Sequence, residues 1–164
     1  AGLAEAIKMA ATSDAELFEK IESSTDLFAD LDEIIKGALL IKKDVVEKDP
    51  KEKGLRKILN FGHTIGHAIE SFEGGALFHG ECVGIGMLPM SSDEASSRIK
   101  KVLEKYELPV SAKASAEELL PYIMHDKKMQ SRTISIIYVE SIGSCEIRDI
   151  PQEEIGSYLK RLER

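Results

Sequence analysis

The stretch Arg56-Lys-Ile-Leu-Asn60-Phe-Gly-His63-Thr-Ile-Gly-His67-Ala-Ile-Glu70 carries the densest pattern in this sequence. Its polar residues are spaced four, three and four apart: Arg56, Asn60, His63 and His67. On one continuous helix, which turns by about 100° per residue, these side chains fall within roughly 60° of one another. The stretch therefore predicts a helix that packs on an apolar face and gathers a guanidinium, an amide and two imidazoles on the other.

Two histidines four residues apart, His63 and His67, can contact one small object, such as a metal ion or a substrate group. The alternative is that both rings make structural hydrogen bonds. His79 follows twelve residues after His67, so three of the chain's four histidines lie in one window. Gly62 and Gly66 cost a helix about 1 kcal/mol each relative to alanine. Their presence indicates close approach by another backbone or by a ligand.

Composition excludes several classes of protein. Of 164 residues, 43% are hydrophobic and 31% are charged, which is typical of a globular domain. The net charge of −7 argues against general nucleic-acid binding. There is no apolar run of membrane-spanning length and no signal peptide, so we expect no membrane contact. Cys82 and Cys145 match no metal or redox motif, and we expect reduced thiols in a cytoplasmic protein. The abrupt opening without methionine suggests a piece of a longer protein.

Apolar residues at helical spacing, separated by capping and turn residues, predict helices along most of the chain. These helices are expected at about 1–11, 14–21, 26–46, 56–70, 79–88, 93–106, 115–124 and 151–164. Two runs rich in β-branched residues, 134–139 and 145–149, predict a hairpin. No dinucleotide-binding fingerprint follows a predicted strand. The expected fold class is mainly α: one multi-helix domain, residues 1–164, with one small β-hairpin near the C-terminus.

Several charged residues allow two interpretations each. Glu5 and Lys8, three residues apart on a helix, can face one pocket or form a weak surface ion pair. Lys42 lies in an otherwise apolar helical stripe, where it either extends its ammonium to solvent or points into a site. Glu52 belongs to a charged turn, residues 47–54, that leads directly into the Arg56 stretch.

The segment Gly54–Glu70, followed by His79-Gly-Glu-Cys-Val-Gly-Ile-Gly-Met87, closely resembles 3-dehydroquinate synthase. The opening Gly2-Leu-Ala-Glu5-Ala-Ile-Lys8 is similar to the start of that family's helical domain, and Asp126-Lys127-Lys128 also fits. The resemblance implies a C-terminal helical domain that binds metal and substrate. It also implies an N-terminal, Rossmann-like NAD-binding domain, which is absent from this chain, with the active site between the two.

The resemblance further implies a reaction. Such enzymes convert 3-deoxy-D-arabino-heptulosonate 7-phosphate to 3-dehydroquinate plus phosphate in the shikimate pathway, which leads to chorismate and the aromatic amino acids. NAD oxidises the substrate transiently and is regenerated, and the metal is Zn²⁺, with Co²⁺ as a possible substitute. The full-length protein is expected to be a homodimer. This chain alone is expected to be inactive because the NAD domain is missing.

The family's functional residues map onto positions in this sequence. The implied metal ligands are Glu5, His63 and His79. His67 would be the catalytic acid and base, and Glu52 would join it in a proton relay. The residues implied to bind the anionic substrate are Lys8, Lys42, Arg56, Asn60 and one of Lys127 and Lys128.

Three alternatives remain open. The chain could belong to another sugar-phosphate cyclase, such as 2-deoxy-scyllo-inosose synthase, which shares the metal and much of the mechanism. It could belong to a metal-dependent polyol dehydrogenase, which uses NAD as a net oxidant. It could also be a non-catalytic helical binding module whose histidines are structural. A surface that the absent domain normally covers is expected to be apolar and exposed.

Overall fold

The computed structural model describes residues 2–126 and 132–163. Within them lie eight α-helices: α1 (Gly2–Ser13), α2 (Ala15–Ser23), α3 (Leu27–Lys48), α4 (His63–Glu73), α5 (His79–Met87), α6 (Asp93–Lys105), α7 (Ala116–Asp126) and α8 (Ile155–Lys160). The described 3-10 helices are η1 (Leu55–Asn60), η2 (Gln152–Glu154) and η3 (Arg161–Glu163), and the strands are β1 (Thr133–Tyr138) and β2 (Glu146–Pro151). The mainly α fold class with one C-terminal hairpin is confirmed.

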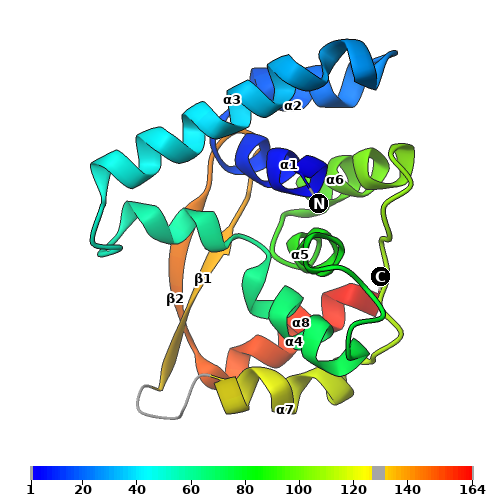
Figure 1. Ribbon diagram of the computed structural model, residues 1–164. Helices are drawn as coiled ribbons and strands as arrows, with labels where there is room; N and C mark the ends of the chain where they lie inside the picture. The colour runs from blue at the N-terminus through cyan, green and yellow to red at the C-terminus, as the bar shows by residue number, and fades with distance from the viewer. Residues whose placement is uncertain (1, 127–131, 164) are drawn as a thin grey trace.

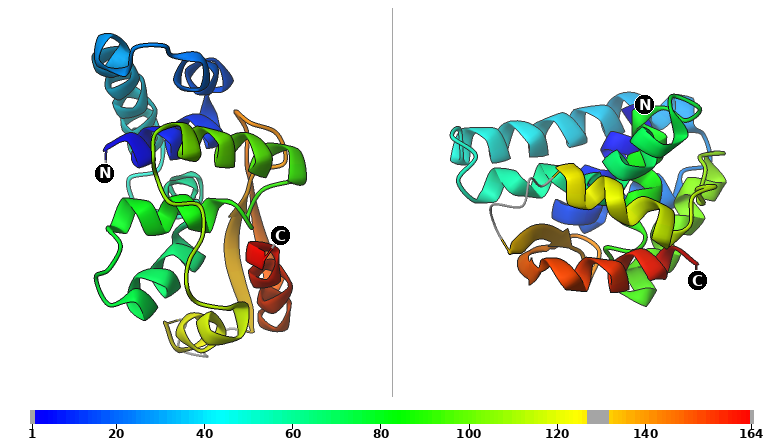
Figure 2. Two further views of the ribbon diagram at one scale, coloured as in Figure 1. Left: turned by 90° about the vertical axis from the view of Figure 1, so that its right-hand side faces the viewer. Right: turned by 90° about the horizontal axis from the view of Figure 1, so that it is seen from below.

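Helix α1 occupies the centre of the upper half of the molecule, between the long helix α3 and helix α5 (Figure 1). Its alanine-rich sequence allows neighbours to approach closely, and nearly every residue from Ala4 to Thr12 is buried. Helices α4, α7 and α8 lie below α5, and the hairpin runs along one side of the helical body (Figures 1 and 2). A contact between the Tyr138 and Tyr158 rings packs α8 against β1.

The hairpin is antiparallel, with Thr133 opposite Pro151 and Tyr138 opposite Glu146. Two backbone hydrogen bonds attach its first strand to the turn between α5 and α6. The Val139 amide donates to Met90 O at 3.1 Å, and the Ser92 amide donates to Val139 O at 2.9 Å. The hairpin is therefore fixed to the helical body, with β1 close to the segment that contains the histidines.

Side-chain caps begin several helices where the sequence predicts them. The Asp14 carboxylate accepts a hydrogen bond from the Leu17 amide at 3.0 Å and starts α2. Asp26 caps α3, and Ser92 caps α6. Ser115 starts α7 as half of a reciprocal capping box with Glu118. Such caps satisfy amide donors that have no partner within the helix.

The prediction of one continuous helix over residues 56–70 is wrong. Residues Leu55–Asn60 form the 3-10 helix η1, and α4 begins only at His63. Between them Gly62 has φ +79°, and a Cβ atom there would lie 2.6 Å from Val83 O. The left-handed backbone at Gly62 ends one helix and starts another. Arg56 and Asn60 are therefore not aligned with the histidines by a shared helical periodicity.

The prediction that Pro151 starts the last helix is also wrong. Pro151 is the last residue of β2 and pairs with Thr133. Its place at the strand end is compatible with the missing amide donor of proline. The 3-10 turn η2 follows, and α8 begins at Ile155. The tertiary pairing of the hairpin thus displaces the helix start by four residues from the local signal.

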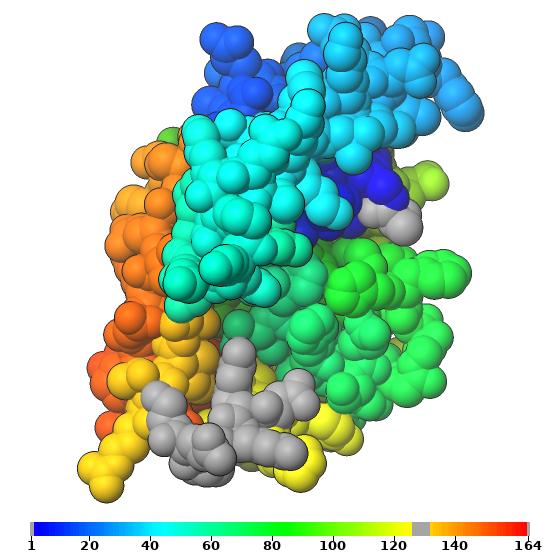
Figure 3. Space-filling view, turned by 60° about the vertical axis from the view of Figure 1, so that its left-hand side comes forward, coloured from blue at the N-terminus to red at the C-terminus, as the bar shows by residue number. Residues whose placement is uncertain are grey.

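Helix α3 buries only part of its apolar stripe. Ile34, Ala38 and Val45 are buried, whereas Leu39 is 60% exposed and Phe28 is 92% exposed. The helix, drawn in cyan, forms the upper part of the face seen in Figure 3. The helix therefore presents apolar side chains to solvent, and the covering of this surface by a further domain stays a prediction. Among the described residues, no helix is both long and apolar enough to cross a membrane.

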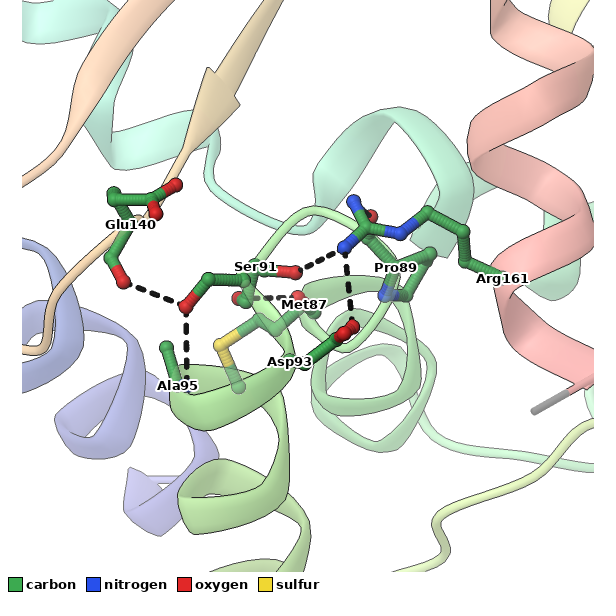
Figure 4. A network of polar contacts seen from close by, with 8 residues as sticks. Met87, Pro89, Ser91, Asp93, Ala95, Glu140 and Arg161 are labelled. Carbon is green, nitrogen blue, oxygen red and sulfur yellow. Dashed lines mark hydrogen bonds and ion pairs between the residues drawn. The ribbon is translucent and has the colours of Figure 1, made fainter.

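The C-terminal segment is attached to the turn between α5 and α6 by Arg161. Its guanidinium donates to Pro89 O at 2.9 Å and to Ser91 O at 2.8 Å, and it lies 3.8 Å from the Asp93 carboxylate (Figure 4). The Ser91 hydroxyl, fully buried, donates to Met87 O at 2.8 Å. This network positions the end of α5, whose first residue is His79.

We expect Arg161→Ala to lower the free energy of unfolding by about 2 kcal/mol, because two carbonyls lose their donor. Urea denaturation followed by circular dichroism measures this loss. The exposed neighbour Lys160 provides the control, since Lys160→Ala should change stability by less than about 0.5 kcal/mol. Equal effects of the two substitutions would contradict the assignment of a structural role to Arg161.

Candidate metal centre and adjoining cavity

Three imidazoles converge where the first turns of α4 and α5 meet. His63 is the first residue of α4, His67 lies one turn further, and His79 is the first residue of α5. One ligand atom from each ring lies within 4.8 Å of the other two. The ring centroids are separated by 5.2, 5.3 and 5.7 Å. In the described part of the chain, these are the only histidine, cysteine or acidic side chains whose donor atoms converge in this way.

Glycines allow the two helices to come this close. A Cβ atom on Gly86 of α5 would lie 2.2 Å from Gly62 O and 2.7 Å from the Gly66 amide nitrogen. A Cβ atom on Gly66 of α4 would lie 3.0 Å from Val83 Cα. The expectation that Gly62 and Gly66 serve close backbone approach is confirmed. The helix crossing, rather than sequence spacing, brings His79 to the histidines of α4.

The local environment of His63 favours a neutral ring with one free nitrogen. Nδ1 of His63 lies 3.2 Å from Phe61 O. With its proton on Nδ1 the ring donates to this carbonyl, and Nε2 keeps its lone pair. Burial, with a smaller contribution from the Lys8 cation, lowers the pKa of His63 from 6.5 to about 4. His63 is therefore neutral near pH 7, which is the state that binds metal.

The lowered pKa of His63 predicts a pH-dependent stability in the metal-free chain. Between about pH 4 and 6.5, the unfolded chain binds a proton at this ring that the folded chain does not bind. The free energy of unfolding should be highest above this window and fall as pH decreases through it. Because the ring is partly exposed, we expect a loss of about 1–2 kcal/mol.

Urea denaturation at several pH values, with a chelator present, measures this dependence. In His63→Gln, the free energy of unfolding should lack the part of its pH dependence that comes from this ring. His125 is exposed, and His125→Gln should retain that part. The same pH slope in His63→Gln as in the parent would contradict the assignment.

Lys8 is a buried cation next to the histidines. Its side chain is almost inaccessible, and Nζ donates to Leu59 O at 2.6 Å and pairs with Glu5 at 3.0 Å. Burial lowers the pKa of Lys8, Glu5 partly opposes this shift, and the positive charge of Lys42 adds to it. The charges of Glu5 and of the exposed Lys42 are therefore close enough to affect Lys8. Glu5 and Lys8 do form the ion pair that their spacing allows, but Lys8 is buried whereas Glu5 is partly exposed.

A cavity of about 570 Å³ adjoins the histidines. Of the residues predicted to be functional, Glu52, Asn60, His63 and His67 lie on its wall. Sequence reasoning missed the remaining lining residues, which come from η1, α4, α7 and β1. They are Lys57, Thr64, Ile123, Thr133, Ile134, Ser135 and Ile137.

The helix type explains which residues of η1 face the cavity. A 3-10 helix has about three residues per turn, so residues three apart share a side. Lys57 and Asn60 therefore point together into the cavity. Arg56 does not line the cavity, and its Nη1 donates to Pro50 O at 3.1 Å. The α-helical periodicity assumed from sequence selected Arg56 and overlooked Lys57.

Asp49 shapes the turn that contains Glu52. Its carboxylate accepts hydrogen bonds from the backbone amides of Lys53, Gly54 and Arg56 at 2.9, 2.7 and 3.0 Å. These bonds, led by the one from Arg56, lower the pKa of Asp49. Within the turn Glu52 has φ +54°, a left-handed conformation that is uncommon for a residue other than glycine. Such strain persists only where surrounding contacts impose it, as they do here.

The placement of Glu5 differs from the expected ligand set. Glu5 is not among the converging ligand atoms, and its carboxylate contacts Lys8 instead. Lys127 and Lys128 lie outside the described residues. His67 has no hydrogen-bond partner on its ring among the described residues. Its ring centroid lies 5.2 Å from that of His63 and 5.7 Å from that of His79.

Comparison with known proteins identifies the family of this chain. The family model "3-dehydroquinate synthase C-terminal" matches residues 2–129. The 3-dehydroquinate synthase of Enterococcus faecalis is 42% identical over 98% of this chain, and that of Latilactobacillus sakei is 37% identical over 99%. The chain spans about half the length of these curated relatives, 49% and 48% respectively.

Solved structures share the fold. A 2-epi-5-epi-valiolone synthase from Streptomyces hygroscopicus, with NAD⁺ and Zn²⁺ bound, has a TM-score of 0.79 at 24% identity over 98% of this chain and 50% of its own. A 2-deoxy-scyllo-inosose synthase complexed with carbaglucose-6-phosphate, NAD⁺ and Co²⁺ has a TM-score of 0.72 at 19% identity, over 96% and 49%. At these identities the likeness shows the fold alone. The family model and the curated relatives extend over most of the sequence, and the chain therefore belongs to the 3-dehydroquinate synthase family, matching its C-terminal domain.

Proposed function

We propose that this chain supplies the metal and substrate groups of a 3-dehydroquinate synthase, which converts 3-deoxy-D-arabino-heptulosonate 7-phosphate to 3-dehydroquinate plus phosphate. The observation that carries the proposal is the convergence of His63, His67 and His79 beside a cavity that also presents Glu52 and Asn60. An N-terminal half outside this chain would bind NAD, which would accept and return the substrate's hydride. The full-length protein would be a cytoplasmic homodimer of the shikimate pathway.

The donor set fits a divalent metal of the zinc type. Neutral imidazoles are good ligands for Zn²⁺ and Co²⁺, and burial keeps His63 neutral. Two ligand sets are compatible with the residues present. The family resemblance favours Glu5, His63 and His79, whereas the convergence of ligand atoms favours the three histidines. A bound ion would polarise substrate oxygens and lower the pKa of a coordinated hydroxyl.

Side chains on and near the cavity wall would bind the substrate and transfer protons. His67, whose ring lacks a hydrogen-bond partner among the described residues, would give and accept protons near the metal. Glu52, on the same cavity wall, would relay these protons. The residues that would hold the carboxylate, hydroxyls and phosphate of the substrate are Lys8, Lys42, Arg56 and Asn60, with one of Lys127 and Lys128. Lys57, which also lines the cavity, adds a cation to this set.

Zinc titration of this chain tests the ligand sets. We expect the parent to bind one Zn²⁺ and His79→Ala to abolish binding. With Glu5 as the third ligand, Glu5→Ala should weaken binding strongly and His67→Ala should change it little. With three histidine ligands, the effects of these two substitutions should be reversed. Absence of zinc binding by the parent would contradict a metal centre in this chain.

The reaction itself requires the protein with its N-terminal half. The proposed activity releases one phosphate per substrate without net NADH formation. Net NADH formation would indicate a polyol dehydrogenase, and turnover of a different sugar phosphate would indicate another cyclase. A non-catalytic helical module would release no phosphate, form no NADH and need no zinc. Measuring free phosphate and NADH in the same reaction separates these alternatives.

A further inference from the structure

Glu70 makes a short contact with the candidate metal ligand on α5. Its Oε2 atom lies 2.6 Å from Nδ1 of His79. Glu70 belongs to the helix that carries His63 and His67, seven and three residues after them. The contact therefore connects the two helices at the point where their histidines converge.

The contact determines which nitrogen of His79 has a lone pair that can bind a metal. A carboxylate is an acceptor only, so Nδ1 must carry the proton in order to donate to Glu70. Nε2 then keeps the lone pair that a metal requires. Phe61 O provides the same arrangement for His63, at 3.2 Å from its Nδ1. One ring is thus oriented by a backbone carbonyl and the other by a carboxylate.

Fold stability does not account for this contact. The side chains of His79 and Glu70 are 52% and 42% exposed, and pairs that are this exposed contribute little to stability. Neighbouring acidic residues have other partners. Glu73 accepts a hydrogen bond from the Lys113 amide at 3.2 Å, and Glu81 accepts one from the Phe78 amide at 2.9 Å. Among the described residues, the one ion pair that Glu70 forms is with His79.

We propose that Glu70 is a positioning residue for the metal centre: its carboxylate holds the His79 ring in the Nδ1–H form and directs Nε2 toward the metal. This inference rests on the proposed function, because it assumes that His79 binds metal. Carboxylates that accept the second ring proton of a histidine ligand raise its basicity and fix its orientation. Losing such a partner typically weakens metal binding about 10–100-fold.

The experiment compares Glu70→Ala with Glu73→Ala in the full 164-residue chain. Both substitutions remove one carboxylate from α4, but only the first removes the partner of His79. Zn²⁺ affinity is measured by competition with a chromophoric chelator. We expect about 10–100-fold weaker binding for Glu70→Ala and a change of less than about threefold for Glu73→Ala. Glu70→Gln, which keeps an acceptor without the charge, should lie between Glu70→Ala and the parent.

A second readout needs no metal. The imidazole nitrogen NMR shifts of the metal-free chain, at mildly alkaline pH, report which nitrogen of His79 carries the proton. We expect the Nδ1–H form to dominate in the parent and in Glu73→Ala, and the Nε2–H form to gain population in Glu70→Ala. A purely structural role for Glu70 would leave this ratio unchanged.

The outcomes separate the inference from the proposed function. Weaker zinc binding together with a changed proton position supports the inference. Normal zinc affinity in Glu70→Ala, or an unchanged proton position, overturns the inference while the metal centre stands. Failure of the parent to bind zinc overturns the metal centre and the inference with it.

Discussion

Replacing Gly86 with alanine is expected to destabilise the chain by about 3 kcal/mol or more. The new Cβ atom would lie 2.2 Å from Gly62 O and 2.7 Å from the Gly66 amide nitrogen. Both of these atoms belong to backbone, which cannot rotate away as a side chain can. The gain in helix propensity, about 1 kcal/mol, offsets only part of this cost. For a chain of this size we expect Tm to fall by roughly 6–12 °C.

Gly84→Ala is the matched control for this prediction. Gly84 lies on the same helix, and a Cβ atom there would meet only the end of the Leu103 side chain, at 3.3 Å. Because that side chain can adjust, we expect stability within about 1 kcal/mol of the parent. Calorimetry of both variants gives Tm. Similar Tm values for Gly86→Ala and the parent would contradict the close helix crossing.

The same substitution should also affect metal binding. His79 and Gly86 share α5, and separating this helix from α4 would move His79 away from His63 and His67. We expect Gly86→Ala to weaken Zn²⁺ binding even at temperatures where the chain is folded, whereas Gly84→Ala should bind like the parent. Zinc titration well below Tm tests this expectation.

Lys8→Met is expected to remove most of the activity of the full-length protein while leaving its stability nearly unchanged. Methionine has an unbranched side chain that can fill the space of the buried lysine stem. Removing a buried charge relieves its desolvation penalty, although Leu59 O then loses its donor. These two effects oppose each other, and we expect a net change within about 1 kcal/mol.

The activity should respond differently, because the proposed role of Lys8 is to bind the anionic substrate. Loss of one desolvated charged contact should reduce kcat/KM about 100-fold, equivalent to about 3 kcal/mol. Lys20 provides a control, since it pairs with Glu33 away from the cavity, and Lys20→Met should retain full kcat/KM. Phosphate release measures activity, and urea denaturation measures stability. Loss of folding in Lys8→Met, or kcat/KM within threefold of the parent, would count against this account.

Much of the fold follows from local signals in the sequence. Four helices are capped by the residue that precedes them: Asp14, Asp26, Ser92 and Ser115. Such a cap is a local signal, because its side-chain oxygen accepts from an amide in the first turn of the same helix. The run that forms β1 is recognisable for a similar reason, since its enrichment in β-branched residues is a local signal. The expected close approach at Gly62 and Gly66 is likewise present in the structure.

The local signals failed where a distant contact competed with them. The segment before His63 has a helical pattern, but Val83 packs against Gly62 and the backbone there is left-handed. The resulting 3-10 helix directs Lys57 rather than Arg56 into the cavity. Pro151 carries a helix-start signal, yet strand pairing extends through it. A periodic sequence pattern is interpreted with an assumed number of residues per turn. Which helix type forms depends on the segment that packs against it.

The mainly α architecture with its hairpin, most helix starts and the set of histidines can be predicted from local sequence, because each depends on neighbouring residues. How those histidines lie relative to one another depends on the packing of the helices. This packing brings His79 onto the histidines of α4 through a glycine-lined crossing, buries Lys8 and pairs Glu70 with His79. These relations join atoms from separate helices, and their distances depend on how closely the backbones pack, which no local pattern specifies.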